Sequence, residues 1–197
     1  MNFDILQALF WALTYVLIIF VGIRYHKEFL PSMPLFSCLL NFSWEIIALV
    51  SCFPVWIHIL WTGLDIIIFI LNIQYLFKLK PLYGILYAAG LIVLLFGLSY
   101  VFVLERGMVI SCFIIDLLMA IDYIVNIRRL STHFRTTIGI TKLIGDCFAW
   151  LAYKDVSIYI TIIGIAVLII NIMYVVISYY LYSKAQWQQK HKKKGKA

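Results

Sequence analysis

Charged residues are scarce in this chain of 197 residues. They make up only 13% of the sequence, against about a quarter in ordinary soluble domains, whereas 64% of the residues are hydrophobic and the mean hydropathy is +1.00. This much apolar surface cannot be hidden in one soluble core, so the composition predicts an all-α, multi-pass membrane protein with a single helical domain. We expect no cleavable signal peptide, because the first apolar stretch is long, ends in RYHKE and lacks a small-residue cleavage site.

Motifs of common enzyme chemistries are missing too. The sequence contains no HExxH, GxSxG, Walker or GxGxxG pattern, which argues against zinc-protease, nucleophile-elbow and nucleotide-binding chemistry. The four histidines fall at span ends or in loops, and the four cysteines show no metal-ligand spacing and no CxxC pair. We therefore expect no metal and no cofactor. The cysteines are expected to be small buried hydrophobes, with a Cys52–Cys112 disulfide as the alternative.

Seven stretches approach the roughly 20 mostly apolar residues that a membrane-spanning helix needs. We predict transmembrane helices over residues 5–23, 34–53, 56–77, 82–104, 107–127, 137–153 and 156–182. All four prolines fall at the breaks between them, where a missing backbone N–H costs least. The seventh stretch is long, so we expect it to tilt or to extend beyond the membrane interface.

Basic residues alternate between the predicted loops. One set of loops and the tail hold Arg24, Lys27, Lys78, Lys80, Arg128, Arg129, Arg135 and the lysines from Lys184 to Lys196. The opposite loops hold only Arg106 and Lys154. The positive-inside rule then predicts seven spans in the cell membrane, with the N-terminus outside and the C-terminus in the cytosol.

The net charge of +7 comes largely from this tail, residues 184–197, which follows the seven-helix domain, residues 1–183. Without the tail lysines the chain is close to neutral, so we expect no nucleic-acid partner. A short basic tail beside a membrane helix usually sets topology and contacts anionic lipid, so we expect membrane lipid as a partner.

Polar side chains nevertheless occur inside the predicted spans. The ionisable and amide residues there are Glu45, Asp65, Asp116, Asp122, Lys142, Asp146, Asn41, Asn72, Gln74, Asn126 and Asn171. A charged side chain at mid-bilayer costs roughly 2.5–3.5 kcal/mol, so these groups must face inward. Several pairs are four residues apart and share a helix face: Asn41 with Glu45, Asp122 with Asn126, and Lys142 with Asp146.

Two of these acids have simple structural explanations. Asp122 lies near Arg128 and Arg129 and could form an interfacial ion pair, and Lys142 and Asp146 could neutralise each other. Glu45 is different, because it lies near mid-helix without a basic neighbour in sequence. The alternatives for Glu45 are a hydrogen bond to an amide that serves packing, or a functional site.

An isolated acid in an apolar pocket has a specific chemistry. Burial disfavours its charged form, so a buried Glu tends to stay protonated and can protonate a weak base such as an epoxide oxygen or an alkene. The resulting cation would need aromatic faces around it and a second polar group to remove the proton at the end. Candidate aromatic residues are Phe42, Trp44, Trp61, Tyr100, Trp150, Tyr153 and Tyr174.

Two segments resemble one known family. MPLFSCLLNFSWE, Met33–Glu45, resembles the second-helix motif of the integral-membrane terpene cyclases of fungal meroterpenoid pathways (the paspaline and pyripyropene type), which has a Met-Pro-Leu start and then Asn-Phe/Ile-x-Trp-Glu. TKLIGDCFAWLAY, Thr141–Tyr153, is similar to the family's Arg-Phe-Leu-Gly…Phe-Ala-Trp-Leu-x-Tyr segment, with Lys142 in place of Arg and a shorter spacing.

The resemblance implies a cyclase that is started by protonation, with Glu45 as the family's second-helix acid. The family's other acid lies in the last helix, where this chain has Asn171. An amide cannot exchange a proton as a carboxylate does, so either Asp65, Asp116 or Asp146 has taken over this role or the activity differs.

The leading hypothesis is therefore acid-initiated cyclisation of a lipid-soluble, prenylated small molecule. Its candidate catalytic residues are Glu45, Asp65, Asp146 and Asn171. Its candidate substrate-binding residues are Asn41, Trp44, Trp61, Asn72, Asp116, Lys142, Trp150, Tyr153 and Tyr174. The alternatives are a small-solute transporter with an inward polar path and a non-catalytic protein that senses lipid or ligand.

Overall fold

The structure is a computed structural model that describes residues 3–25, 31, 33–51, 55–101, 107–132 and 134–194. Some of the residues discussed above lie outside this part of the chain, namely His26, Lys27, Cys52, Pro54, Arg106, His133 and Lys196. The side chains of Tyr100 and of residues 189–194 are likewise outside it.

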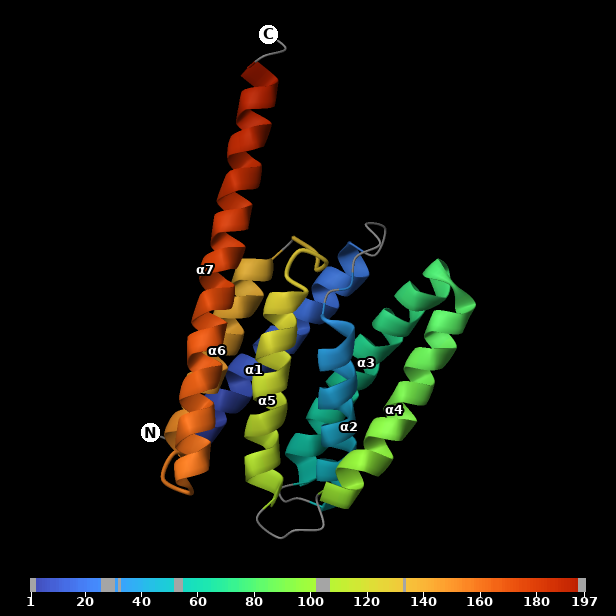
Figure 1. Ribbon diagram of the computed structural model, residues 1–197, viewed down its shortest axis with the longest axis vertical. Coiled ribbons are helices and arrows are strands. Elements are labelled where there is room, and N and C mark those ends of the chain that lie inside the picture. The colour runs from blue at the N-terminus through green and yellow to red at the C-terminus, as the bar shows by residue number, and fades with distance from the viewer. Residues whose placement is uncertain are drawn as a thin grey trace.

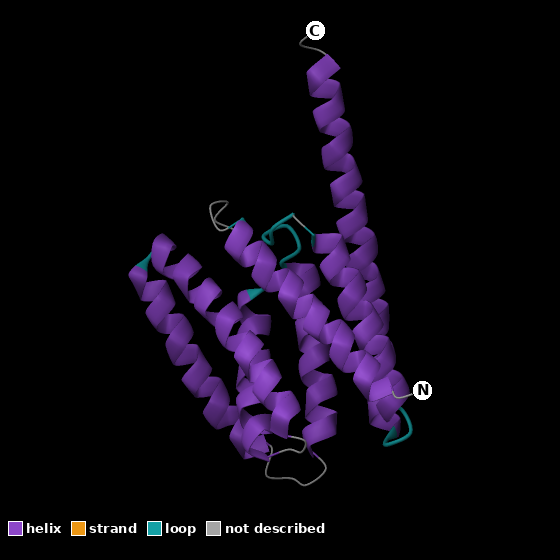
Figure 2. Ribbon diagram, turned by 180° about the vertical axis from the view of Figure 1, so that it is seen from behind, coloured by secondary structure: helices purple, strands orange, loops and turns teal. Residues whose placement is uncertain are grey.

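Every regular element in the described residues is an α-helix, and no strand occurs there (Figures 1 and 2). The seven helices are α1 (Phe3–Arg24), α2 (Leu35–Ser51), α3 (Val55–Leu79), α4 (Pro81–Val101), α5 (Gly107–Val125), α6 (Arg135–Tyr153) and α7 (Ile158–Lys194). The all-α prediction is confirmed, and most of the described helix ends lie within two or three residues of the predicted ones.

Four helices, α1, α3, α4 and α7, are long and apolar enough to cross a membrane, and α2 is a shorter apolar helix. Their outer faces carry large apolar side chains, as lipid contact requires, with Val93 and Phe96 70% and 77% exposed. Helix α6 is less apolar because it carries Arg135, Lys142 and Asp146, and the bundle buries all three. The chain therefore has the make-up of a helical membrane protein.

The bundle has two ends, and consecutive helices run in opposite directions between them (Figure 1). At one end, here called the Asp4 end, α1, α3, α5 and α7 begin. At the other, called the Arg24 end, α1, α3 and α5 finish and α2, α4 and α6 start. Helix α7 is 37 residues long and continues well beyond the bundle at the Arg24 end, so the expected extension of the seventh helix is present.

Two groups of helices pack together to make the bundle. Helix α6 lies between α1 and α7, while α2 packs against α3, α4 and α5 (Figures 1 and 2). Helix α5 contacts both groups, through α2 and through α7, and α1 contacts α3. Functional side chains from α1, α2, α3, α5 and α6 can therefore meet in the space between the two groups.

Close approach of α1 and α6 depends on Gly145. The Trp11 indole lies directly on this glycine, so that a Cβ at position 145 would overlap the ring. The contact lets Trp11 reach the carboxylate of the adjacent Asp146. Gly63 on α3 is different, because nothing lies within 4 Å of the position that its Cβ would take.

We expect Gly145→Ala to destabilise the protein by about 1–3 kcal/mol, because the new methyl group must displace Trp11. Gly63→Ala is the matched control and should be neutral or stabilising by up to about 1 kcal/mol, as alanine is the better helix former. Thermal unfolding of the detergent-solubilised chain measures both effects. If both variants changed the stability by the same amount, the described packing of α1 on α6 would be contradicted.

Candidate functional site

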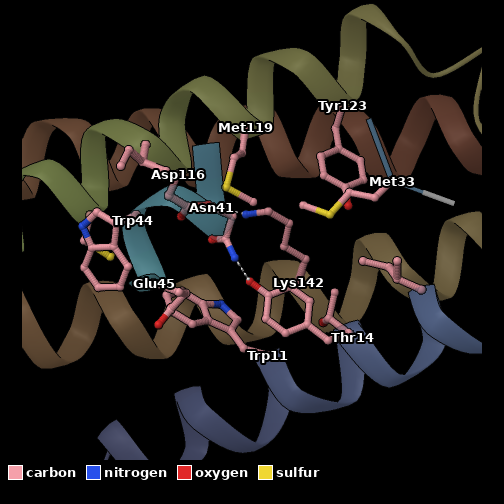
Figure 3. Close-up of a pocket in the computed structure, with 14 residues that line it drawn as sticks. Trp11, Thr14, Met33, Asn41, Trp44, Glu45, Asp116, Met119, Tyr123 and Lys142 are labelled. Carbon is pink, nitrogen blue, oxygen red and sulfur yellow. Dashed lines mark hydrogen bonds and ion pairs between the residues drawn. The ribbon is translucent and has the colours of Figure 1, made fainter. Parts of the chain in front are cut away.

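Two adjoining cavities lie between the helix groups. The larger, here called the outer chamber, has a volume of about 250 Å³ and reaches the Asp4 end, where Asp4 and Gln7 line it. The smaller, called the inner arm, has a volume of about 40 Å³ and runs toward Met33 and Tyr123 (Figure 3). Five lining residues are common to both cavities: Trp11, Trp44, Glu45, Cys112 and Asp116.

Glu45 lies at the junction of these cavities. Its side chain comes from α2 and is almost fully buried, with 4% of the residue exposed. Glu45 Oε2 lies 3.0 Å from Nδ1 of His58 on α3, and the His58 ring packs edge-on against Trp44 at 5.9 Å between centroids. The carboxyl therefore faces the hollow while a hydrogen bond to the imidazole fixes its orientation.

A cluster of charged residues forms the wall opposite Glu45. Lys142 Nζ on α6 donates to Asp146 Oδ2 at 2.6 Å and also to Asp116 Oδ1 on α5. Trp11 Nε1 donates to Asp146 Oδ1 at 2.8 Å, and Asn171 Nδ2 donates to Asp146 Oδ2 at 2.5 Å. The predicted Lys142–Asp146 ion pair is confirmed, and the cluster ties α1, α5, α6 and α7 together.

The roles open to the two acids of this cluster differ. Both oxygens of Asp146 accept hydrogen bonds, and the residue lines neither cavity. Asp116 lines both cavities while it stays paired with Lys142. The geometry thus favours Asp146 as the acid that positions Lys142, and Asp116 as the acid that a ligand can meet.

Asn41 forms a second polar group in the inner arm. Its Nδ2 donates to Tyr15 OH and to Asp65 Oδ2, each at 2.7 Å. Asp65 is fully buried behind Asn41 and lines neither cavity. The amide therefore does not bond to Glu45, its neighbour one turn away, but links α2 to α1 and α3.

The predicted site residues separate into two sets. Those that line a cavity are Glu45, Asn41, Trp44, Trp61, Asp116, Lys142 and Tyr153. Those that line neither are Asp65, Asn72, Asp146, Trp150, Asn171 and Tyr174. Trp150 instead lies beside Lys154, with the cation 5.8 Å from the ring centroid, and Tyr174 packs edge-on against Tyr123. Phe42 packs against Phe69 with the two rings tilted by 43° and also lies outside both cavities.

Aromatic side chains form much of the outer chamber. Its lining includes Trp11, Trp44, Trp61, Phe113 and Tyr153, from five different helices. Trp61 also makes edge-on contacts with Trp11 and Tyr15, which hold the indoles in place. An electron-deficient or cationic ligand would thus meet several π faces within reach of Glu45.

His58 and Trp11 are site residues that reasoning from the sequence missed. Glu45 lies within the last two turns of α2 and His58 within the first turn of α3, so the two residues flank one short connection between antiparallel helices. That proximity was the available signal for His58. Trp11 gave no such signal, because its position depends on how α1 is rotated against α6.

Asp122 has partners other than the predicted arginines. Its Oδ2 accepts from Ser37 N and Ser37 Oγ, both at 2.8 Å, and its Oδ1 accepts from Asn126 Nδ2 at 2.6 Å. The predicted pairing with Arg128 and Arg129 is therefore corrected: this acid of α5 caps the first turn of α2, where backbone N–H groups lack acceptors. The cap fixes the start of the helix that carries Glu45.

The cysteines are free thiols where the structure describes them. Cys38, Cys112 and Cys147 are all unbonded. The alternative of a Cys52–Cys112 disulfide involves Cys52, which lies outside the described residues. Cys112 lines both cavities, whereas Cys38 is fully buried elsewhere in the core. Among the described residues, no group of three His, Cys, Asp or Glu side chains is placed to hold a metal ion.

We expect Lys142→Met to destabilise the protein by about 3–5 kcal/mol, because it leaves the buried Asp146 and the partly buried Asp116 without their cation. Adding Asp146→Asn should recover part of this loss. Lys184→Met, on the exposed part of α7, is the control and should change stability by about 0.5 kcal/mol or less. Unfolding in denaturant measures all three, and equal losses for Lys142→Met and Lys184→Met would contradict the cluster.

Comparisons with known proteins find no relative of this chain. No family model, no curated protein and no solved structure matches the chain significantly. The function of the site therefore has to be inferred from its own residues and geometry.

Proposed function

We propose that the protein is a membrane-embedded, terpene cyclase-like enzyme that cyclises a lipid-soluble prenylated substrate after protonating it. The observation that carries this proposal is the position of Glu45, a buried acid that faces an aromatic-lined chamber and is oriented by His58. The resemblance of Met33–Glu45 to the second-helix motif of such cyclases supports the same chemistry. Proton-initiated cyclisation of this kind would need no cofactor.

The proposed placement in the cell membrane has seven spans, the N-terminus outside and the C-terminus in the cytosol. The alternation of basic residues between the loops supports this topology. The Asp4 end would then face outward and the Arg24 end would face the cytosol. Substrate would enter the outer chamber from the outer half of the membrane.

In the proposed reaction, Glu45 transfers its proton to an epoxide oxygen or an alkene carbon of the substrate. The C–O bond opens, or the alkene π bond is consumed, and the next alkene attacks the cation to form a carbon–carbon ring bond. The indole faces of Trp11, Trp44 and Trp61 stabilise the cation in a chamber that limits contact with water. Loss of a proton to a base then forms the final alkene, so the overall change is an isomerisation.

Asp116 is the best placed group to receive that last proton. Of the three acids that could replace the family's last-helix carboxylate, Asp116 lines both cavities, whereas Asp65 and Asp146 line neither. Asn171 supports this cluster indirectly, since it donates to Asp146, which in turn holds Lys142. The proton returns from Asp116 to Glu45 across the junction that both residues line.

A transporter of small solutes is the second candidate, because Asp4 and Gln7 give the outer chamber a polar mouth. In that case the paired groups Asp116 and Lys142 would bind the solute rather than take part in proton transfer. Uptake of solute into proteoliposomes without chemical change would support transport and contradict the cyclase. Ligand binding with neither turnover nor uptake would instead support a sensing protein.

We expect Glu45→Gln to reduce cyclised product by at least about 100-fold while the protein remains folded, because general acid catalysis typically contributes that much. The assay incubates membranes that contain the protein with epoxidised and with plain prenylated aromatic compounds. Asp116→Asn should reduce turnover or divert it to water-quenched alcohols. Asp65→Asn, a buried acid outside the cavities, is the control and should keep most of the activity.

Melting temperatures of these variants separate a loss of chemistry from a loss of fold. Wild-type membranes that give no cyclised product from either compound class would contradict the proposal. So would a Glu45→Gln variant that cyclises the substrate as fast as the wild type does.

A further inference from the structure

A groove separate from the candidate site lies at the Arg24 end. It has a volume of about 630 Å³ and runs between the start of α6 and the part of α7 from Ser178 to Gln186. Its lining is rich in hydroxyl groups and contains no acidic residue: Thr132, Phe134, Arg135, Thr136, Thr137, Ser178, Tyr179, Leu181, Tyr182, Ala185 and Gln186. It shares no lining residue with the outer chamber or the inner arm.

The first turn of α6, from Arg135 to Thr137, lines this groove. Phe134 occupies the N-cap position, and its side chain makes no capping hydrogen bond. The first N–H groups of a helix have no acceptor within the helix, and the helix dipole places partial positive charge at this end. Phe134 also has a left-handed backbone, with φ of 56°, which is uncommon for a bulky residue.

Arg135 adds a positive charge to this groove. The residue is 6% exposed, and its Nε and Nη2 donate to the main-chain oxygens of Ser131 and Leu130 at 3.2 and 2.5 Å. These carbonyls satisfy hydrogen bonds but carry no charge. In the part of the chain that the structure describes, no carboxylate pairs with Arg135, although a buried cation normally needs an anion.

Ser178 supplies a second observation at this groove. It comes from α7, is 2% exposed and lines the groove. Tyr174 lies beside it, but within the described part of the chain its Oγ makes no hydrogen bond of ordinary geometry. A buried hydroxyl that lacks a partner is costly, and a bound acceptor oxygen would remove that cost. The hydroxyl, the guanidinium and the open helix end come from two helices and line one groove.

We propose that this groove binds a phosphate group, either on the headgroup of a membrane phospholipid or as the free ion. A phosphate carries negative charge and several acceptor oxygens, so it can accept from the helix N–H groups, from Arg135 and from Ser178 at once. The Arg24 end is the end that the basic loops place at the cytosolic leaflet, where anionic lipids gather. The exposed Tyr179 and Tyr182, 63% and 55% exposed, suit the headgroup level of a membrane.

Melting of the full-length chain in neutral detergent tests this site. The probes are a short-chain phosphatidic acid, the diacylglycerol with the same acyl chains, inorganic phosphate, and chloride at matched ionic strength. We expect phosphatidic acid to raise the melting temperature by several degrees and diacylglycerol and chloride to leave it unchanged. Stabilisation by inorganic phosphate as well would show that the phosphate itself suffices, whereas stabilisation by the lipid alone would assign the site to a headgroup.

Three variants separate a built site from general attraction of anions to a basic protein. Ser178→Ala removes one donor from a helix interior and keeps the fold. It should weaken the apparent affinity for phosphatidic acid by about tenfold, because one hydrogen bond to a charged group is lost. Arg135→Gln should abolish the stabilisation. Lys184→Gln removes a charge from the same part of α7 but does not line the groove, so it should respond as the wild type does.

Two results would overturn the proposal. One is an absence of stabilisation by both phosphatidic acid and phosphate. The other is a pattern that fits general attraction of anions. In that pattern Ser178→Ala has no effect on the stabilisation, and Lys184→Gln lowers it as much as Arg135→Gln does. Neither result depends on whether the outer chamber catalyses a cyclisation, because no lining residue of that chamber is changed.

Discussion

Lys142 holds together the buried carboxylate of Asp146 and the partly buried carboxylate of Asp116, in a chain that has few charged residues. Asp116 approaches it from α5 and Asp146 from its own helix, and Trp11 and Asn171 complete the hydrogen bonds of Asp146 from α1 and α7. In an apolar bundle an ion pair of this kind persists only when its geometry and its surrounding hydrogen bonds are nearly complete. The cluster therefore fixes the relative positions of the helices that form one wall of both cavities.

The opposite wall depends on α2 and α3, where His58 holds the carboxyl of Glu45. Asp122 fixes the start of α2, and Asn41 ties its middle to Tyr15 and Asp65. Polar contacts thus set the helices of both walls, while the chamber between them is lined mainly by aromatic and aliphatic side chains. This division leaves the carboxyl of Glu45, held by His58, facing a hollow that is lined mainly by apolar side chains.

Much of the fold follows from the sequence, because the apolar stretches and the prolines between them set the helix boundaries. Helix-face reasoning also correctly paired Lys142 with Asp146 and Asp122 with Asn126, which are one turn apart. It placed Asp65 and Asn72 inward on α3, and both are buried. It could not find contacts that depend on how helices rotate and pack, such as those between Trp11 and Asp146 or between Ser37 and Asp122.

The same limit applies to the candidate site. The Met33–Glu45 motif indicates Glu45 as a site residue. The sequence alone puts His58, the partner of Glu45, at the end of a span and gives it no role in a site. Trp150, Tyr174 and Asn171 fit the chemistry by residue type, yet they lie outside the two cavities. For the second acid, the sequence left three candidates equal. Only the packing of α5 against α2 and α7, which brings Asp116 to both cavities, separates it from the others.

The central claim is that an accessible hollow lies beside Glu45, between walls that these polar contacts hold in place. Cys112 tests it most directly, because this free thiol lines both cavities, whereas the free thiol of Cys38 is fully buried away from them. The measurement is the rate at which a small, membrane-permeant thiol reagent modifies each cysteine in the folded protein, read by peptide mass spectrometry. The account expects Cys112 to react much faster than Cys38, and to be protected when a prenylated aromatic compound is added. Equal, slow modification of both thiols would show that there is no open hollow next to Glu45.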